Sequence, residues 1–315
     1  MRSTTFLSLV ALIPFLLVNS ADAGRRVKMK NVDLTKGEAI PKEATHDWNL
    51  GATGARGWIF SERLETSKAR QIGVTKVAKG TSADGALRVG DVILGVSGKP
   101  FSYDPRVEFG KALSAAEAAS GKLSLIRWRD GRQVLVDISL PVLGAYSNTA
   151  PYHCPKSRQI LVQGCKALAK RMAMPTYKEG TIPRCWNALA LLASGNKTYM
   201  PLIKREAEWA SQFSAEGMAT WYYGYVITFL AEYQMATGDD SFKAGMTRLA
   251  LEAARGQSIV GSWGHKFSGG DGRLVGYGMM NAPGLTLTTS LVLARMAGLQ
   301  EADVDLAIER SAKML

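Results

Sequence analysis

The chain has 315 residues, of which 46% are hydrophobic and 21% charged, and its formal net charge is +12. This length suits about two domains, and the hydrophobic content excludes a wholly disordered chain. The excess positive charge favours anionic surfaces such as phospholipid headgroups or acidic glycans. Because the basic residues are dispersed and no nucleic-acid-reading motif accompanies them, we do not expect a nucleic-acid partner.

The first 23 residues are typical of a secretory signal peptide. Arg2 supplies a positive charge, residues 6–18 (FLSLVALIPFLLV) form an apolar run, and small residues precede a cleavage position after Ala23. This run is too short for a membrane anchor and contains Pro14. The sequence therefore predicts an exported protein, periplasmic or extracellular, with no transmembrane segment after cleavage.

The chain contains three cysteines, Cys154, Cys165 and Cys185. In an exported protein they permit one disulfide and one remaining thiol, and the sequence does not fix the pairing. Only His153 lies beside a cysteine, and histidines and cysteines do not repeat at zinc-ligand spacing. We therefore expect neither a metal site nor another cofactor.

Residues 48–141 alternate short strands with turn residues at a hydrophobic period of two. A hairpin is expected through the turn at Asp130–Gly131. A short helical piece is expected at 81–87 and a longer helix from Pro105, with Asp104 as its N-cap. The expected strands are 57–60, 71–77, 91–96, 121–128 and 133–140.

This order of strands and helices resembles a PDZ domain. The resemblance is carried by residues 55–60 (ARGWIF), by residues 80–101 (GTSADGALRVGDVILGVSGKPF) and by the helix at 105–118. It implies a small β-sandwich or barrel with two helices. It also implies a groove that binds a partner by β-augmentation, in which the C-terminus or an extended segment of the partner joins an exposed sheet edge as an extra strand.

In PDZ domains, backbone N–H groups that follow a glycine hold the terminal carboxylate of the ligand. Gly57 stands at that place, so the resemblance implies the amides of Trp58, Ile59 and Phe60 as donors. The family usually has a second glycine where Ile59 stands, and a β-branched residue resists a positive φ. The alternatives are that the groove takes an internal segment or is filled by the protein itself. Arg106 is a candidate for contact with a ligand side chain, or else a solvated helix charge.

Beyond a proline-containing linker, the hydrophobic period changes to 3.6 residues. Nearly wholly apolar helices alternate with amphipathic ones, and the apolar helices close at Gly195, Gly238 and Gly298. Helices that are apolar on all sides must be buried, whereas helices with one apolar stripe lie outside. This alternation predicts stacked helical hairpins, in an open solenoid or a closed α/α toroid.

The segment QSIVGSW, with Gln257, Gly261 and Trp263, is similar to the glutamine–tryptophan motif of squalene and oxidosqualene cyclases. In those enzymes the motif ties one helical hairpin to the next, so the resemblance implies a toroid and a structural role. The whole arrangement resembles a family of bacterial secreted proteins known only as a domain of unknown function. Because the chain stops inside an amphipathic helix at Leu315, we expect a fragment with an incomplete toroid.

Catalysis requires a nucleophile, a base and an orienting group within reach of one another, and no motif in the sequence shows such a set. Of the three histidines, His265 lies in a glycine-rich loop with Asp271, Tyr277 and Asn281 nearby in sequence. His265 and Asp271 are therefore the candidates for general acid–base chemistry. The alternative is a loop histidine that only bonds backbone carbonyl groups.

We therefore predict a multidomain α+β protein that is exported and binds peptides or proteins. The PDZ-like domain would capture an extended chain, and the helical toroid would present a second binding surface. The alternative is an enzyme that acts on polysaccharide or peptide in the toroid cavity, with the PDZ-like domain recruiting substrate. The expected boundaries are 1–23 for the signal peptide, 24–47 for an N-terminal extension, 48–141 for the PDZ-like domain, 142–155 for the linker and 156–315 for the helical domain.

Overall fold

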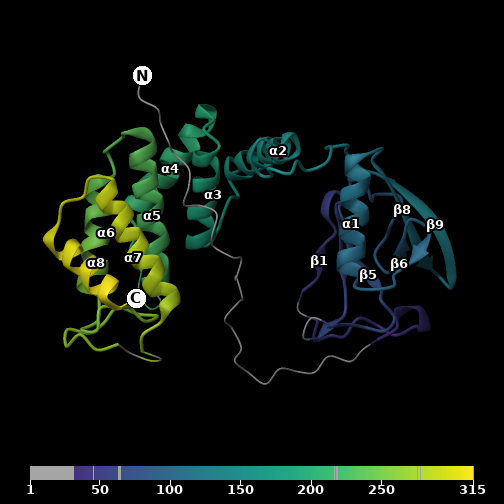
Figure 1. The fold of residues 1–315 in the computed structure, drawn as a ribbon, viewed down its shortest axis with the longest axis horizontal. Coiled ribbons are helices and arrows are strands. Elements are labelled where there is room, and N and C mark those ends of the chain that lie inside the picture. The colour runs from purple at the N-terminus through teal and green to yellow at the C-terminus, as the bar shows by residue number, and fades with distance from the viewer. Residues whose placement is uncertain are drawn as a thin grey trace. The chain divides into compact units, whose positions relative to one another are not determined.

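A computed structural model describes most of the chain after the first 31 residues (Figure 1). The expected signal peptide, 1–23, and Tyr277 lie outside the described residues. The chain divides between Tyr146 and Ser147 into two compact units, and each is described by itself. The described residues are 32–44, 46–62, 65–215, 217, 219–274, 276 and 278–314.

The N-terminal unit is built on an antiparallel sheet, and seven strands of the described chain belong to it. The strand order is β1-β2-β5-β6-β8-β9, and β7 pairs with β6. The strands β3 and β4 form a separate hairpin. The bounds are β1 (Trp48–Asn49), β2 (Ala55–Trp58), β3 (Ser61–Glu62), β4 (Glu65–Thr66), β5 (Ile72–Val77), β6 (Val92–Val96), β7 (Lys99–Pro100), β8 (Lys122–Arg129) and β9 (Arg132–Ser139).

The expected hairpin through Asp130 and Gly131 is confirmed. The strands β8 and β9 pair along their whole length, from Lys122↔Ser139 to Arg129↔Arg132. Asp130 has φ of 50° and Gly131 has φ of 78°, as a two-residue turn with two positive φ angles requires. The helical piece expected at 81–87 is instead a series of turns with an isolated bridge between Asp84 and Leu87.

One helix, α1 (Pro105–Ala118), packs against β6 and β8. Asp104 is its N-cap and accepts a hydrogen bond of 2.9 Å from the Arg106 N–H. The helix buries Phe109 and Ala116 in the core of the sheet. The turn before β6 is fixed by the fully buried Asp91, whose carboxylate accepts two bonds, of 2.6 and 2.7 Å, from Arg129.

The C-terminal unit is helical, so the protein is mixed α+β as predicted (Figure 1). None of the helices within the described residues has the length and apolar character needed to cross a membrane. The bounds are α2 (Pro155–Met172), α3 (Thr181–Ala193), the 3-10 helix η3 (Lys197–Tyr199), α4 (Met200–Ser211), α5 (Ala219–Thr237), α6 (Lys243–Arg255), α7 (Asn281–Met296) and α8 (Ala302–Met314).

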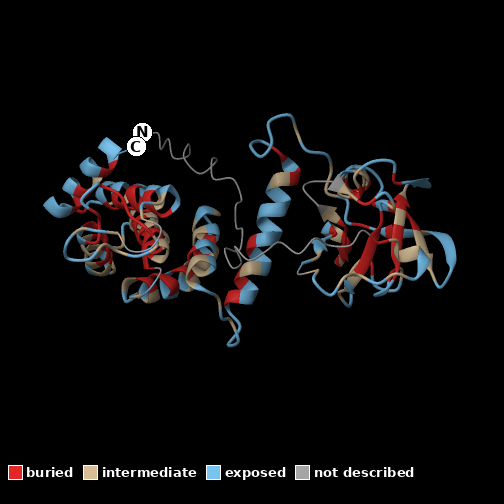
Figure 2. Cartoon of the chain, turned by 90° about the horizontal axis from the view of Figure 1, so that it is seen from below, coloured by how far each residue is buried: buried red, intermediate tan, exposed pale blue. Residues whose placement is uncertain are grey.

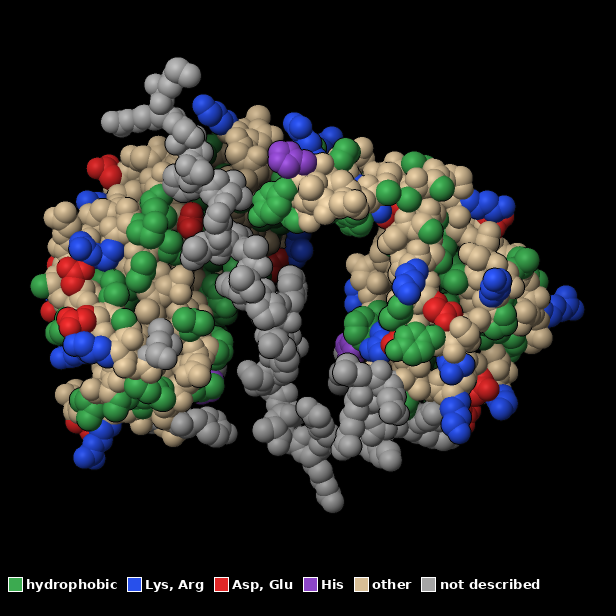
Figure 3. Space-filling model, in the orientation of Figure 1, with side chains coloured by type: hydrophobic (Ala, Val, Ile, Leu, Met, Phe, Trp, Pro, Cys, Tyr) green, Lys and Arg blue, Asp and Glu red, His purple; other side chains and the backbone are tan. Residues whose placement is uncertain are grey.

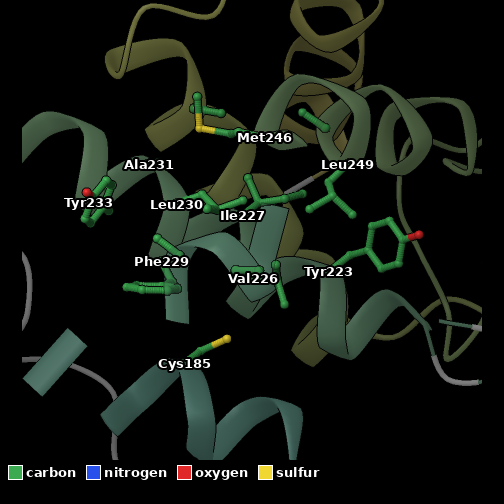
Figure 4. Close-up of a cluster of buried hydrophobic side chains, with 14 of the residues drawn as sticks. Cys185, Tyr223, Val226, Ile227, Phe229, Leu230, Ala231, Tyr233, Met246 and Leu249 are labelled. Carbon is green, nitrogen blue, oxygen red and sulfur yellow. The ribbon is translucent and has the colours of Figure 1, made fainter. Parts of the chain in front are cut away.

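The helices α3 to α8 form two layers. In one layer α5 packs between α3 and α7, and in the other α6 packs between α4 and α8. The core lies between the layers, where Val226 and Ile227 of α5 meet Met246 and Leu249 of α6 (Figure 4). Cys154, Cys165 and Cys185 are all buried free thiols.

The prediction that apolar helices are buried on all sides holds for α5 but not for its neighbours. Trp186 of α3 is 39% exposed, and Leu285 and Met296 of α7 are 54% and 66% exposed. Buried residues otherwise gather inside each unit (Figure 2). The layer of α3, α5 and α7 therefore keeps an apolar side that no described helix covers.

Candidate functional site

The sheet edge that was expected to be open beside Gly57 is already paired. Strand β1 lies antiparallel to β2, with Trp48 opposite Gly57 and Asn49 opposite Arg56. The prediction of a free edge at this position is therefore wrong, and the chain itself supplies the added strand. This corresponds to the alternative in which the protein fills its own groove.

A short turn folds β1 back onto β2. The 3-10 helix η2 (Gly51–Thr53) connects them, and the Leu50 N–H donates to the Ala55 carbonyl at 3.0 Å. The Asn49 side chain accepts a bond of 2.9 Å from the Gly51 N–H. Gly54 ends the turn with φ of 75°, a left-handed conformation that favours glycine.

The same segment also contacts α1. The Arg106 guanidinium lies 5.5 Å from the centroid of the Trp48 ring, and a Cβ at Gly51 would come within 2.8 Å of Leu113 Cδ2. Leu50 is buried in the core cluster that contains Phe109. Residues 48–51 thus contact both β2 and α1. We call the position that they occupy, beside β2 and α1, the β2–α1 site.

Arg106 is held in position rather than solvated. It donates to the Asp104 carboxylate at 2.5 to 3.0 Å and to Ser61 Oγ at 3.2 Å. The hydrogen bond with Asp104 raises the pKa of Arg106, and the same contact lowers the pKa of Asp104. The guanidinium therefore presents a fixed positive charge to the Trp48 ring, which suits a cation–π contact.

Asp47, the residue directly before β1, forms hydrogen bonds on the face of this segment opposite Trp48. Its carboxylate accepts bonds of 2.5 Å from Thr75 Oγ1 and 2.5 Å from Arg56 Nε. The hydrogen bond from Thr75 is the largest cause that lowers the pKa of Asp47, and Arg56 adds to it. Asp47 and Trp48 thus point to opposite faces of the strand, as consecutive residues do.

The residues predicted to cradle a ligand carboxylate are arranged differently from the expectation. The left-handed glycines are Gly51 and Gly54 rather than residues 57–60. Gly57 is required for packing, because a Cβ there would come 2.5 Å from Ile72 Cγ2. Ile59 is buried in the main core of the unit.

The side chains of Trp58 and Phe60 are buried in a second cluster, with Val32. Leu34 and Ile40 pack against this cluster. Residues 32–44 of the expected extension thus share a core with the strand that follows Gly57. Neither aromatic side chain is available for ligand contact.

Sequence reasoning did not identify Asp47, Trp48 or Leu50. The signal was present, because the alternating residues of DWNL precede a turn sequence with glycines at Gly51 and Gly54. Such a pattern is typical of a hairpin. It is only two residues long on one side, which is too short for a reliable period.

The loop around His265 is held by α5. The Trp221 indole N–H donates to His265 Nδ1 at 2.8 Å, and the two rings stack with centroids 5.9 Å apart. Thr220 Oγ1 lies 2.7 Å from the carbonyl oxygens of Gly264 and His265. The described contacts of Asp271 are with Arg273, by a bond of 3.0 Å and an ion pair of 3.8 Å. No described contact joins the two predicted catalytic residues.

The residues of the glutamine–tryptophan segment connect α6 to α8. Gln257 Nε2 donates to the Ala307 carbonyl at 2.8 Å, and Trp263 Nε1 donates to the Ala253 carbonyl at 2.9 Å. Trp263 is fully buried. Gly261 has φ of 86°, and a Cβ there would come 2.6 Å from the Arg310 carbonyl oxygen. The segment links the end of one hairpin to the next.

On the face shown in Figure 3, charge does not single out another site, because Lys and Arg side chains are scattered over both units and interspersed with acidic ones. Within the described residues, no group of three or more His, Cys, Asp or Glu side chains could hold a metal ion.

The helical unit decides the family. Residues 157–315 match the family described as "Domain of unknown function (DUF6288)". The chain belongs to this family. Comparison with curated proteins and comparison with solved structures gave no match. The DUF6288 match begins within α2 and covers the two helical layers with the loop around His265, whereas the β2–α1 site lies before it.

Proposed function

We propose that this protein is exported and binds an extended peptide or protein segment, with its N-terminal unit acting as a PDZ-like module. The ligand would bind at the β2–α1 site. The observation that carries the proposal is that residues 48–51 of the chain already lie there as an added antiparallel strand. A site that accepts one extended backbone offers the same edge to another, which is the basis of β-augmentation.

The packing around the site supports this proposal. The helix α1 runs beside the sheet and carries Arg106, which is held over the strand position by Asp104 and Ser61. Strand β1 has only two residues, both exposed, so few contacts oppose its replacement. The site therefore combines a helix whose Arg106 side chain is held in place with a short strand, β1, that can be replaced.

We further propose that the helical unit is toroid-like and supplies a second binding surface. Its two layers and the links from Gln257 and Trp263 to neighbouring helices support this reading. The exposed apolar side chains of Trp186, Leu285 and Met296 lie on the layer that would line such a surface. An enzyme has less support, because Asp271 forms an ion pair with Arg273 and His265 Nδ1 accepts a hydrogen bond from the Trp221 indole N–H.

A peptide library tests the binding proposal. Ten-residue peptides, each with a free and an amidated C-terminus, would be screened against the mature chain, and amide hydrogen exchange would locate the bound ones. We expect selected peptides to slow exchange in β2 and α1. Because residues 57–60 have no left-handed glycine, we expect acid and amide forms to bind alike. The proposal would be contradicted if the selected peptides slowed exchange only in the helical unit. It would also be contradicted if no peptide bound, even to a variant in which substitutions in residues 47–49 weaken the pairing of β1.

A further inference from the structure

We propose that residues 47–49 are a built-in ligand of the β2–α1 site, and that the partner carries an acidic residue followed directly by an aromatic one. This inference rests on the proposed peptide-binding function and names the chemistry of the partner. The partner segment would displace Asp47, Trp48 and Asn49 and pair antiparallel with β2 in their place.

The two faces of β1 define the two requirements. On one face the Trp48 ring meets the Arg106 guanidinium at 5.5 Å; this guanidinium is already paired with the Asp104 carboxylate, and it can still attract an aromatic ring. On the other face the Asp47 carboxylate meets Arg56 and Thr75 at 2.5 Å each. A carboxylate is the group that satisfies an arginine and a hydroxyl together.

One recognition side chain remains in place when β1 leaves, because Arg106 keeps its bonds to Asp104 and Ser61. The backbones of Arg56 and Thr75 stay in the paired strands β2 and β5, whereas the described bonds of their side chains are to Asp47. An incoming acidic–aromatic pair therefore meets a preorganised Arg106, which lowers the entropic cost of binding.

The occupant has short backbone pairing, a partly exposed Trp48, and a tether at both ends. Trp48 is 37% exposed, and only two residue pairs join β1 to β2. On the C-terminal side Leu50 is buried in the core, and on the N-terminal side residues 32–44 pack on Trp58 and Phe60. A tethered segment competes at a high effective concentration. The wild-type chain should therefore bind free peptides poorly and gain affinity when β1 is weakened.

The test uses a fluorescent peptide with the sequence of residues 43–51, EATHDWNLG. Its affinity would be measured for the wild-type mature chain, for Asp47→Ala/Trp48→Ala, and for Val134→Ala as the matched control. Val134 is 39% exposed against 37% for Trp48, and it lies on β9, at the opposite end of the strand order from β1. Circular dichroism would verify that each variant is folded.

We expect the double variant to bind this peptide at least about tenfold more tightly than the wild type or the control, because the internal competitor is removed. Peptides with Asp→Asn or Trp→Ala at the two key positions should lose about tenfold in affinity for the double variant. Adding Arg106→Met to the double variant should remove the preference for the aromatic residue while leaving the preference for the acid.

The possible failures are distinguishable. If the wild type and the double variant bind the peptide with equal affinity, the proposal that residues 47–49 are a built-in ligand is wrong. If the double variant ignores this peptide but binds library peptides that protect β2, the acidic–aromatic rule is wrong and the binding function stands. If it binds no peptide of either kind, the binding function itself fails.

Discussion

The two units each hold a tryptophan that joins separate parts of the chain, and the two are held very differently. Trp48 is 37% exposed and lies on a two-residue strand, whereas Trp263 is fully buried and bonds the end of α6. We propose that the first contact is exchanged for an equivalent one from another chain. The second cannot be removed without leaving a cavity. The comparison separates a place suited to binding from a place that maintains the fold.

The largest expected effect comes from truncating the buried tryptophan. Trp263→Ala should destabilise the helical unit by about 3–5 kcal/mol, because it leaves a cavity and an unpaired carbonyl at Ala253. Trp48→Ala should change the stability of its unit by less than about 1 kcal/mol, as expected for a half-exposed contact. Thermal unfolding followed by calorimetry measures both. Similar losses of unfolding free energy in the two variants would show that Trp48 and Trp263 are equally important for stability.

A smaller effect should follow when a side chain is added at Gly57. Gly57→Ala places a Cβ 2.5 Å from Ile72 Cγ2, so overpacking should cost about 1–3 kcal/mol in the N-terminal unit. Gly110→Ala is the control, because no neighbouring atom lies within 4 Å of that position in α1. There alanine should stabilise the helix by about 0.5–1 kcal/mol. Urea unfolding of both variants would test the pair, and a neutral Gly57→Ala would show that β2 is not packed as described.

The His265 loop should respond modestly to loss of its anchor. Trp221→Phe keeps an aromatic ring but removes the N–H bond to Nδ1, so we expect a cost of about 0.5–1.5 kcal/mol. Asp271→Asn, on the same loop, should have almost no effect, since its ion pair with Arg273 is exposed. Local hydrogen exchange of residues 264–274 reports the loosening. A large effect of Asp271→Asn would instead point to a role that the described contacts do not provide.

The smallest effect concerns pH. The pKa of Asp47 is lowered in the folded chain, mainly by the hydrogen bond from Thr75. A lowered pKa gives stability that is present above the unfolded pKa of about 3.9 and is lost as the pH falls through the folded value. Hydrogen exchange at the Gly57 amide, which faces β1, should therefore accelerate below about pH 4 relative to the rest of the sheet. Asp47→Asn should abolish this pH dependence of exchange. If the variant keeps the pH dependence of the wild type, Asp47 is not the group that causes it.

The sequence predicted elements whose signals are local. The hairpin at Asp130–Gly131 follows from a turn in which both residues take a positive φ. The helices of the C-terminal unit follow from an apolar period that extends over many residues. The segment 81–87 was misread because Gly85 has φ of 86°, which breaks a helix into turns.

The sequence did not predict what depends on distant pairing. The contact of Trp48 with Arg106 joins residues that are far apart in the chain, so it leaves no local signal. Conversely, His265 and Asp271 are close in sequence yet bond to different partners, Trp221 and Arg273. Proximity along the chain was therefore a poor guide to the chemistry of the loop.

Hydrogen exchange of the double variant Asp47→Ala/Trp48→Ala, with and without the acidic–aromatic peptide, tests the central claim most directly. Without peptide, the Gly57 amide, which faces β1, should exchange faster than in the wild type, because its partner strand is weakened. Saturating peptide should restore its protection and leave the helical unit unchanged. If the peptide binds yet leaves the Gly57 amide unprotected, the β2–α1 site is not where this protein receives its ligand.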